Sequence, residues 1–178
     1  MGGSDKGWAL RRGEPLVQAV LAQLRSQVSG PVIVSANRSL AAYAALGCEV
    51  VPDGDPLRDE GGGTAGPLAG MLAVLAHLAR AQPGRAVAFV PCDAPEFPAD
   101  LVARLHAAAG QGAAVACSGG RWQPVFCLLP AGALPALRQA WEGGERRPES
   151  FLRSLGAVAV DFPAPGAFRN CNTPEDLA

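Results

Sequence analysis

The sequence of 178 residues has a single lysine, Lys6, and its other basic residues are all arginine. It contains no run of basic residues and no basic stripe interleaved with aromatic residues, and the formal net charge is −1. These absences argue against a dedicated nucleic-acid-binding protein, which needs a basic surface to bind the phosphate backbone. An anionic ligand must therefore be held by a few local residues.

Metal-binding cysteine pairs and long apolar segments are also lacking. The five cysteines are widely spaced with no C-x-x-C pair, and His77 and His106 have no visible partner for metal binding or nucleophilic catalysis. This pattern predicts reduced cysteines and no zinc or redox motif. No segment has the layout of a signal peptide, and the longest apolar helical pattern is broken by His77 and Arg80. We therefore expect a cytoplasmic protein with no membrane partner.

Apolar runs rich in valine and phenylalanine alternate with helical patterns along most of the chain. Strands are predicted at residues 31–36, 48–51, 85–92, 113–117, 123–129 and 158–162. Helices are predicted at residues 15–27, 39–46, 66–81, 98–109, 133–141 and 148–155, with a last one after residue 173. Such alternation predicts a three-layer, doubly wound α/β fold with a mostly parallel sheet. The length favours one domain, residues 1–178.

Four clusters of polar residues follow predicted strands or precede the last predicted helix. They are Ser35-Ala36-Asn37-Arg38, Pro52-Asp53, Pro91-Cys92-Asp93-Ala94-Pro95 and Asn170-Cys171-Asn172-Thr173-Pro174. In doubly wound sheets, ligands bind outside the carboxyl ends of the strands. We therefore expect the clusters to converge on one site.

Asp93 and Lys6 are the candidates for chemistry at this site. Asp93 ends the apolar run 85–92 between two prolines. It suits a carboxylate that holds Mg2+ together with nucleotide phosphates, because magnesium takes one or two protein carboxylates plus phosphate and water. The alternative is a turn or helix-capping aspartate. Lys6 suits phosphate binding as a compact point charge, and the alternative is an exposed lysine near a chain end.

Four other polar residues each have two interpretations. Asp53 could accept hydrogen bonds from a nucleobase or ribose, or it could be an ordinary turn residue. Asn37 could orient a base or a phosphate, or it could cap the following helix. The same alternatives apply to Asn170 and Asn172, beside the last predicted helix.

Two further segments could contact an anion. Gly66 and Pro67 open a helix whose first N–H groups are free to approach a ligand. The pair Arg146-Arg147 could bind an anionic substrate through bidentate hydrogen bonds, or it could form a solvated charged turn.

Seven short features occur in order along the chain. They are Met-Gly-Gly-x-Asp-Lys at 1–6, Ala-Asn-Arg at 36–38, Asp53, Gly-Pro-Leu-Ala-Gly-Met at 66–71, Pro-Cys-Asp-x-Pro at 91–95, Gly-Glu-Arg-Arg at 144–147 and Asn-x-Asn-Thr-Pro-Glu at 170–175. Together they resemble the molybdenum cofactor guanylyltransferases, which are nucleotidyltransferases with a Rossmann-like fold. The resemblance implies transfer of GMP from GTP to the phosphate of molybdopterin, with Mg2+ and with release of pyrophosphate.

The resemblance also implies roles and partners. The nucleotide-binding residues would be Lys6, Asn37, Asp53, Gly66, Pro67, Leu68 and Asp93, with Lys6 and Asp93 catalytic and Asp93 the metal ligand. The residues on the pterin side would be Arg146, Arg147, Asn170 and Asn172. The partners would be GTP and molybdopterin or the molybdenum cofactor, with other cofactor-synthesis proteins and recipient molybdoenzymes as further candidates.

The chain departs from the family pattern in two places. Ser35 replaces the first asparagine of an Asn-x-Asn-Arg motif, and the family's first apolar strand and Leu-Ala-Gly-Gly phosphate loop have no counterpart here. We therefore expect the first strand of the sheet to be missing, through truncation or, alternatively, divergence. Its absence would leave neighbouring backbone unpaired. The functional alternatives are a sister nucleotidyltransferase using CTP or a sugar phosphate, and a catalytically silent nucleotide- or pterin-binding module.

Overall fold

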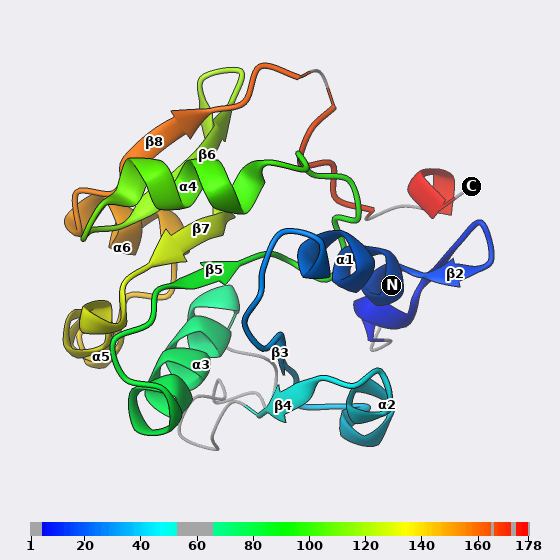
Figure 1. Ribbon diagram of the computed structural model, residues 1–178, viewed down its shortest axis with the longest axis horizontal. Helices are drawn as coiled ribbons and strands as arrows, with labels where there is room; N and C mark the ends of the chain where they lie inside the picture. Colours follow the sequence, from blue (N-terminus) through cyan, green and yellow to red (C-terminus); the bar gives the residue numbers. More distant parts are fainter. Residues whose placement is uncertain (1–4, 53–65, 165, 172–173, 178) are drawn as a thin grey trace.

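The computed structural model describes residues 5–52, 66–164, 166–171 and 174–177 (Figure 1). The helices are α1 (Leu16–Arg25), α2 (Leu40–Ala45), α3 (Pro67–Ala81), α4 (Leu101–Ala109), α5 (Leu134–Glu142) and α6 (Pro148–Ser154). The strands are β1 (Leu10–Arg11), β2 (Glu14–Pro15), β3 (Ile33–Ser35), β4 (Glu49–Val51), β5 (Val87–Phe89), β6 (Ala114–Ser118), β7 (Arg121–Leu129) and β8 (Val158–Asp161). The short 3-10 helices within the described residues are η1 (Lys6–Trp8), η3 (Ala131–Ala133) and η4 (Pro174–Leu177).

The larger sheet has the strand order β5-β7-β6-β8. β6 and β8 are parallel, whereas β7 is antiparallel to both β5 and β6. Three of its four strands therefore run in one direction, and β3 and β4 form a separate parallel pair. The predicted α/β fold is confirmed, although two of the three ladders in the larger sheet are antiparallel, so this sheet is mixed.

Alternate residues of β6 and β7 face opposite helical layers, as the period of two in a strand requires. One layer contains α3, α5 and α6 and covers Val115, Cys127 and Leu129. The other contains α1 and α4 and covers Phe126 and Leu128. Apolar residues on both faces explain why these strands read as continuous hydrophobic runs.

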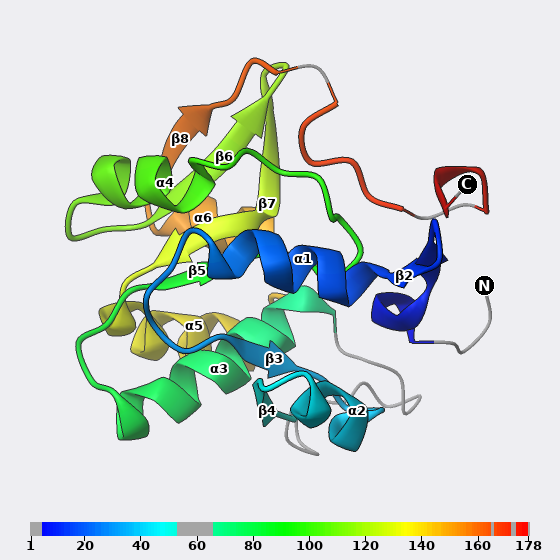
Figure 2. The same cartoon turned by 45° about the vertical axis from the view of Figure 1, so that its right-hand side comes forward.

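The parallel pair β3–β4 lies with α2 apart from the larger sheet (Figures 1 and 2). Ile33 of β3 and Val87 and Phe89 of β5 pack against the same α3 residues, including Val74 and Leu78. Even so, among the described strands β3 pairs only with β4 and β5 only with β7. All residues of β5 and the first two of β3 are half-buried. Two strands thus share a helical layer without sharing a backbone ladder.

The hairpin β1–β2 is an element that the sequence analysis did not predict. Its turn is Arg12-Gly13, with φ values of 52° and 84°, which are typical of a type I′ turn. Leu10 pairs with Pro15, and the amide of Leu16 donates to the carbonyl of Ala9 at 3.0 Å. The hairpin therefore leads directly into α1.

The ends of two predicted elements also differ. The strand expected at residues 85–92 is short, because the regular ladder of β5 covers only Val87–Phe89. The last predicted helix is a 3-10 helix, Pro174–Leu177. Among the described helices, none combines the length and apolar character that crossing a membrane requires.

Candidate active site

Lys6 and Asp93 lie side by side although they are far apart in the sequence. Lys6 opens η1, and Asp93 follows β5 in the loop beyond its carboxyl end. The Lys6 Nζ is 3.7 Å from the Asp93 Oδ2, and the two side chains are 54% and 15% exposed. The two residues to which the family resemblance assigns the nucleotide phosphates and the metal are thus adjacent in the fold. A lysine that remains half-exposed here can also reach an anionic ligand.

Asp5, Gly7 and Tyr43 fix the backbone around Lys6. The Tyr43 hydroxyl donates to the Asp5 Oδ1 at 2.6 Å, and the same oxygen accepts from the Gly7 amide at 3.3 Å. A Cβ on Gly7 would lie 2.6 Å from the Tyr43 hydroxyl, which is too close for any other residue without a shift. Burial, and then the hydrogen bond to Asp5, raise the pKa of Tyr43. Tyr43 therefore acts as a neutral donor that orders the segment carrying Lys6.

Cys92 lies between these elements but is unsuited to nucleophilic catalysis. Burial raises the pKa of its thiol to about 11, and the negative charges of Asp93 and Asp5 add to this effect. The thiol is therefore protonated at neutral pH, whereas the thiolate is the reactive form. All five cysteines are free, as the sequence predicts.

The residues that begin α3 combine an open backbone position with a buried side chain. Gly66 precedes the helix with φ of 79°, and no atom lies within 4 Å of a Cβ placed there. Pro67 occupies the first turn, and the side chain of Leu68 is fully buried in the core. Any contact of Leu68 with a nucleotide would therefore use its backbone N–H, which lies in the first turn where amides lack helical partners.

The remaining predicted residues are unevenly placed. Asn37 is half-buried directly after β3, close to where the Ala36 amide bonds the Val51 carbonyl at 3.2 Å. Asn170 is exposed, next to Cys171, whose amide donates to the Asp93 carbonyl at 2.8 Å. Asp53 and Asn172 lie outside the described residues.

Arg146 and Arg147 follow α5, and their interactions among the described residues are local. Arg146 donates to the carbonyls of Trp141 and Glu145 at 2.8 and 2.9 Å, and its guanidinium lies 3.8 Å from the Trp141 ring centroid. Arg147 is 80% exposed, with its Nε 3.4 Å from the Glu145 Oε1. Arg146 therefore closes the end of α5, and Arg147 is the more available of the two for a ligand.

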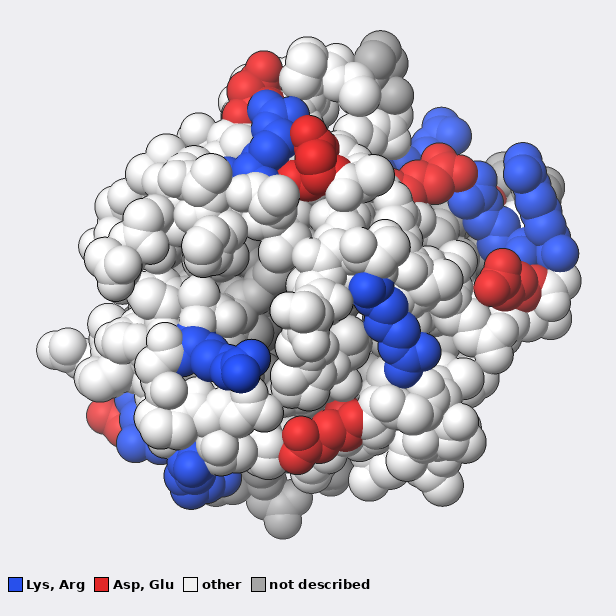
Figure 3. Space-filling model, viewed as in Figure 1, with Lys and Arg blue, Asp and Glu red and all other residues white. Residues whose placement is uncertain are grey.

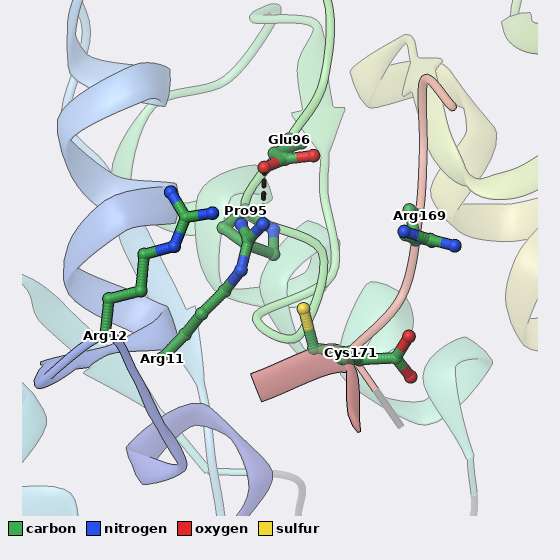
Figure 4. Close-up of a pocket in the computed structure, with 7 residues that line it drawn as sticks. Arg11, Arg12, Pro95, Glu96, Arg169 and Cys171 are labelled. Carbon is green, nitrogen blue, oxygen red and sulfur yellow. Dashed lines mark ion pairs between the residues drawn. The ribbon is translucent and has the colours of Figure 1, made fainter. Parts of the chain in front are cut away.

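A pocket next to Asp93 contains residues that the sequence analysis did not select (Figure 4). Its volume is about 190 Å³, and it is lined by Arg11, Arg12, Pro95, Glu96, Arg169, Cys171 and Asp176. Tertiary packing brings these residues together from three segments, so no local motif marks them. The adjacent pair Arg11-Arg12 is the nearest signal in the sequence.

The face shown in Figure 3 carries acidic and basic side chains intermixed, with several of both signs gathered over the β1–β2 hairpin at its right-hand edge. This face has no extended field of one sign, which agrees with the low net charge.

Asp93 fits the chemistry of a magnesium site completed by a nucleotide. Its carboxylate is partly exposed and lies beside a lysine. Among the described residues, no group of three or more His, Cys, Asp or Glu side chains could hold a metal ion. Magnesium is commonly held by one or two carboxylates together with substrate phosphates. A metal at Asp93 would therefore depend on bound nucleotide for most of its ligands.

The comparisons with known proteins agree with this arrangement. Residues 1–159 match a family model described as a MobA-like NTP transferase domain. The structure resembles molybdopterin-guanine dinucleotide biosynthesis protein A from Archaeoglobus fulgidus, with a TM-score of 0.69 at 21% identity over 98% of this chain and 88% of that one. It resembles 2-C-methyl-D-erythritol 4-phosphate cytidylyltransferase from Thermus thermophilus equally, with a TM-score of 0.69 at 20% identity over 97% and 90%. The family match and this fold define a nucleotidyltransferase domain.

Proteins related in sequence identify the family within the nucleotidyltransferases. A molybdenum cofactor guanylyltransferase from Pasteurella multocida (strain Pm70) is 43% identical over 99% of this chain and 90% of its own length. Another, from Serratia proteamaculans (strain 568), is also 43% identical over 99% of this chain and 85% of its own length. The chain therefore belongs to the molybdenum cofactor guanylyltransferase family, and the resemblance carried by its motifs is confirmed.

Proposed function

We propose that this protein transfers GMP from GTP to the phosphate of molybdopterin and releases pyrophosphate. The observation that carries the proposal is the 3.7 Å approach of Lys6 to Asp93. A cation and a metal-binding carboxylate placed this close together can act on one triphosphate. An ion pair between two residues that the family resemblance assigns to one nucleotide supports this role for Asp93 over that of a turn aspartate.

Lys6 would neutralise charge on the phosphates of GTP through the transition state. Preorganised charges are effective because they need no rearrangement as the reaction proceeds. Asp93 would hold Mg2+, which supplies positive charge to the triphosphate and to the pyrophosphate that leaves. The segment that begins α3, from Gly66 to Leu68, would help hold the guanosine, together with Asn37 and Asp53.

The reaction needs no covalent enzyme intermediate. An oxygen of the molybdopterin phosphate forms a bond to the α-phosphorus of GTP, and the bond from that phosphorus to the leaving pyrophosphate oxygen breaks. The protein's contribution is to position the two anionic reactants and to offset their charge. We assign Asn170, Asn172, Arg146 and Arg147 to the pterin side.

We place this reaction in the cytoplasm, where thiols such as the five free cysteines remain reduced. The direct partners would be GTP and molybdopterin, and recipient molybdoenzymes or other cofactor-synthesis proteins would receive the product.

The test is pyrophosphate release with magnesium, molybdopterin, and either GTP or CTP. The 178-residue chain would be compared with a version extended upstream by an apolar strand and a Leu-Ala-Gly-Gly loop. Turnover with GTP but not CTP is expected. Turnover with CTP instead would indicate a sister cytidylyltransferase, and tight pterin binding with no release in either version would indicate a silent binding module.

A further inference from the structure

We propose that the pocket formed by Arg11, Arg12 and Arg169 binds the phosphate of the acceptor substrate, an organic phosphomonoester. This inference rests on the proposed function, because it assigns a place to the second substrate of that reaction. We use the name arginine pocket for the cavity lined by Arg11, Arg12, Pro95, Glu96, Arg169, Cys171 and Asp176.

The arginine pocket is held next to Asp93 by backbone pairing. The Phe168 amide donates to the Glu96 carbonyl at 3.1 Å, and the Cys171 amide donates to the Asp93 carbonyl at 2.8 Å. Between these bonds, Glu96 and Arg169 form an antiparallel bridge. The segment that carries Arg169 is therefore fixed against the loop that begins with Asp93, so an anion in the pocket would lie near the candidate metal ligand.

The charges lining the arginine pocket favour an anion. The lining residues include three guanidinium groups and two carboxylates, those of Glu96 and Asp176. The Arg11 Nη2 is 2.7 Å from the Glu96 Oε1. Arg12 and Arg169 have no ion-pair partner among the described residues, so their charges remain available.

Arginine is the side chain best suited to a phosphate in such a pocket. Its planar fork can donate two parallel hydrogen bonds to phosphate oxygens, and it stays charged at all physiological pH values. The hydrogen bond to Glu96 is the main cause that raises the pKa of Arg11 further. The Arg11 Nε is buried without a hydrogen-bond partner among the described residues. Arg11 thus serves mainly to anchor the hairpin to the Asp93 loop, while Arg12 and Arg169 supply the free charge.

The backbone conformation of Arg12 also supports the assignment of this pocket. Its φ of 52° lies in the left-handed region, where asparagine, aspartate and glycine are preferred. This value fits the first position of the type I′ turn, although arginine is not among the residues that the turn prefers. Figure 4 shows Arg11 and Arg12 rising from the hairpin on one side of Pro95, with Arg169 on the other side. Arginine is less favourable than asparagine at this turn position, but it places a long cationic side chain at the pocket.

A second hollow adjoins the arginine pocket and offers room for the rest of the acceptor. It has a volume of about 210 Å³ and shares Arg11, Arg12 and Pro95 with the first. It also includes the apolar side chains of Leu16 and Ala19. A charged end next to an apolar surface suits an organic phosphomonoester better than free phosphate.

The test uses Arg12→Asn and Arg169→Gln, alone and together, in the full chain. Asparagine keeps the left-handed turn favourable while it removes the charge of Arg12, so this variant should fold. Arg138→Gln is the matched control, because Arg138 lies on α5, on a different element from the pocket. Equilibrium dialysis would measure binding of molybdopterin and of inorganic phosphate without GTP. Steady-state kinetics would give kcat and the KM values for both substrates.

The double variant is expected to raise the Kd and KM for molybdopterin by at least about 10-fold, the loss typical of charged hydrogen bonds. We expect the KM for GTP to be nearly unchanged and Arg138→Gln to match the wild type. Unchanged molybdopterin binding in the double variant would overturn the proposal, as would equally tight binding of inorganic phosphate or no binding by the wild type.

The same measurements separate this proposal from the proposed function. Arginine-dependent molybdopterin binding without turnover on GTP would support the pocket and reject the guanylyl transfer. Turnover on GTP with a KM for molybdopterin that is unchanged when both arginines are replaced would support the transfer and reject the pocket.

Discussion

The two parallel-strand regions of this molecule are supported very differently. In β6, Ala114, Val115 and Ala116 are fully buried, with a sheet partner on each side. In β3, Ile33 and Val34 are only half-buried, and β4 is the strand's one partner among the described strands. Because β3 is only partly covered and has one ladder partner among the described strands, whereas β6 is buried and paired on both edges, β3 is held less firmly than β6.

The candidate active site joins these two regions. Asp93 follows β5 of the larger sheet. Lys6 belongs to the N-terminal segment, which packs through Trp8 against Tyr43 of α2, with ring centroids 5.3 Å apart. The Lys6–Asp93 approach therefore joins the edge of the larger sheet to the part of the molecule that contains β3 and β4. Such a site is sensitive to how firmly the smaller part is held.

The largest effect is expected at Asp93, which follows β5 of the larger sheet. Asp93→Ala should lower kcat by about 10²- to 10³-fold, the range for loss of a group that stabilises charge in the transition state. Asp53→Ala should mainly raise the KM for GTP, because a base contact acts equally in the ground and transition states. Steady-state kinetics with GTP would measure both. Equal losses confined to KM in the two variants would remove this division of roles.

The sequence predicts the fold better than the site. Proline at the first helical turn marks the starts of α3 and α6, and the apolar runs mark the strands. That Lys6 and Asp93 share one site follows in the sequence only from the family resemblance, because Lys6 precedes the first strand and belongs to none of the polar clusters after predicted strands. The contact of Tyr43 with Asp5 depends on how α2 packs, which no local pattern determines.

The arginine pocket shows the same limit. Arg11 and Arg169 come from opposite ends of the chain and meet only because residues 168–171 pair with the loop after Asp93. Neither arginine lies in a motif of the family. Arg146 and Arg147 do lie in one, yet the structure gives both a local partner in Glu145. Motifs thus identify segments, while tertiary pairing decides which side chains remain available.

A matched pair of valines tests the difference between the two sheets directly. Val115→Ala in β6 should lower the free energy of unfolding by about 2 to 3 kcal/mol, from lost burial plus a cavity. Val34→Ala in β3 should cost about 1 kcal/mol or less, since this side chain is half-buried. Urea unfolding would measure both costs, provided that the two variants have the same m-value. Equal costs would show that β3 is as well packed as β6.

Gly7 tests how the smaller region positions Lys6. Gly7→Ala puts a methyl group 2.6 Å from the Tyr43 hydroxyl and should cost about 1 to 3 kcal/mol of stability, as overpacking does. Tyr43→Phe removes the clashing oxygen, so the double variant should recover part of that loss. Thermal unfolding of the two single variants and the double variant gives the coupling. Strictly additive effects would mean that the clash is relieved elsewhere.

The smallest effect is expected at Glu145, far from the junction of the two sheets. Its carboxylate accepts hydrogen bonds from the backbone amides of Arg147 and Arg146 at 2.9 and 3.0 Å, and these bonds lower its pKa. A lowered pKa in the folded state means that the ionised form stabilises the fold above the unfolded pKa of about 4.3. That contribution is lost as the pH falls through the folded pKa.

Glu145→Gln should therefore be less stable than the wild type at neutral pH, and the gap should close below about pH 4. Glu142→Gln is the control, because Glu142 is exposed at the end of α5 without these backbone contacts. Urea unfolding from about pH 3 to about pH 7 would follow the gap. If Glu145→Gln also raised the KM for molybdopterin, the ordering of the Arg147 segment by Glu145 would contribute to substrate binding. A gap that persists at low pH would mean that the carboxylate's charge is not what stabilises this loop.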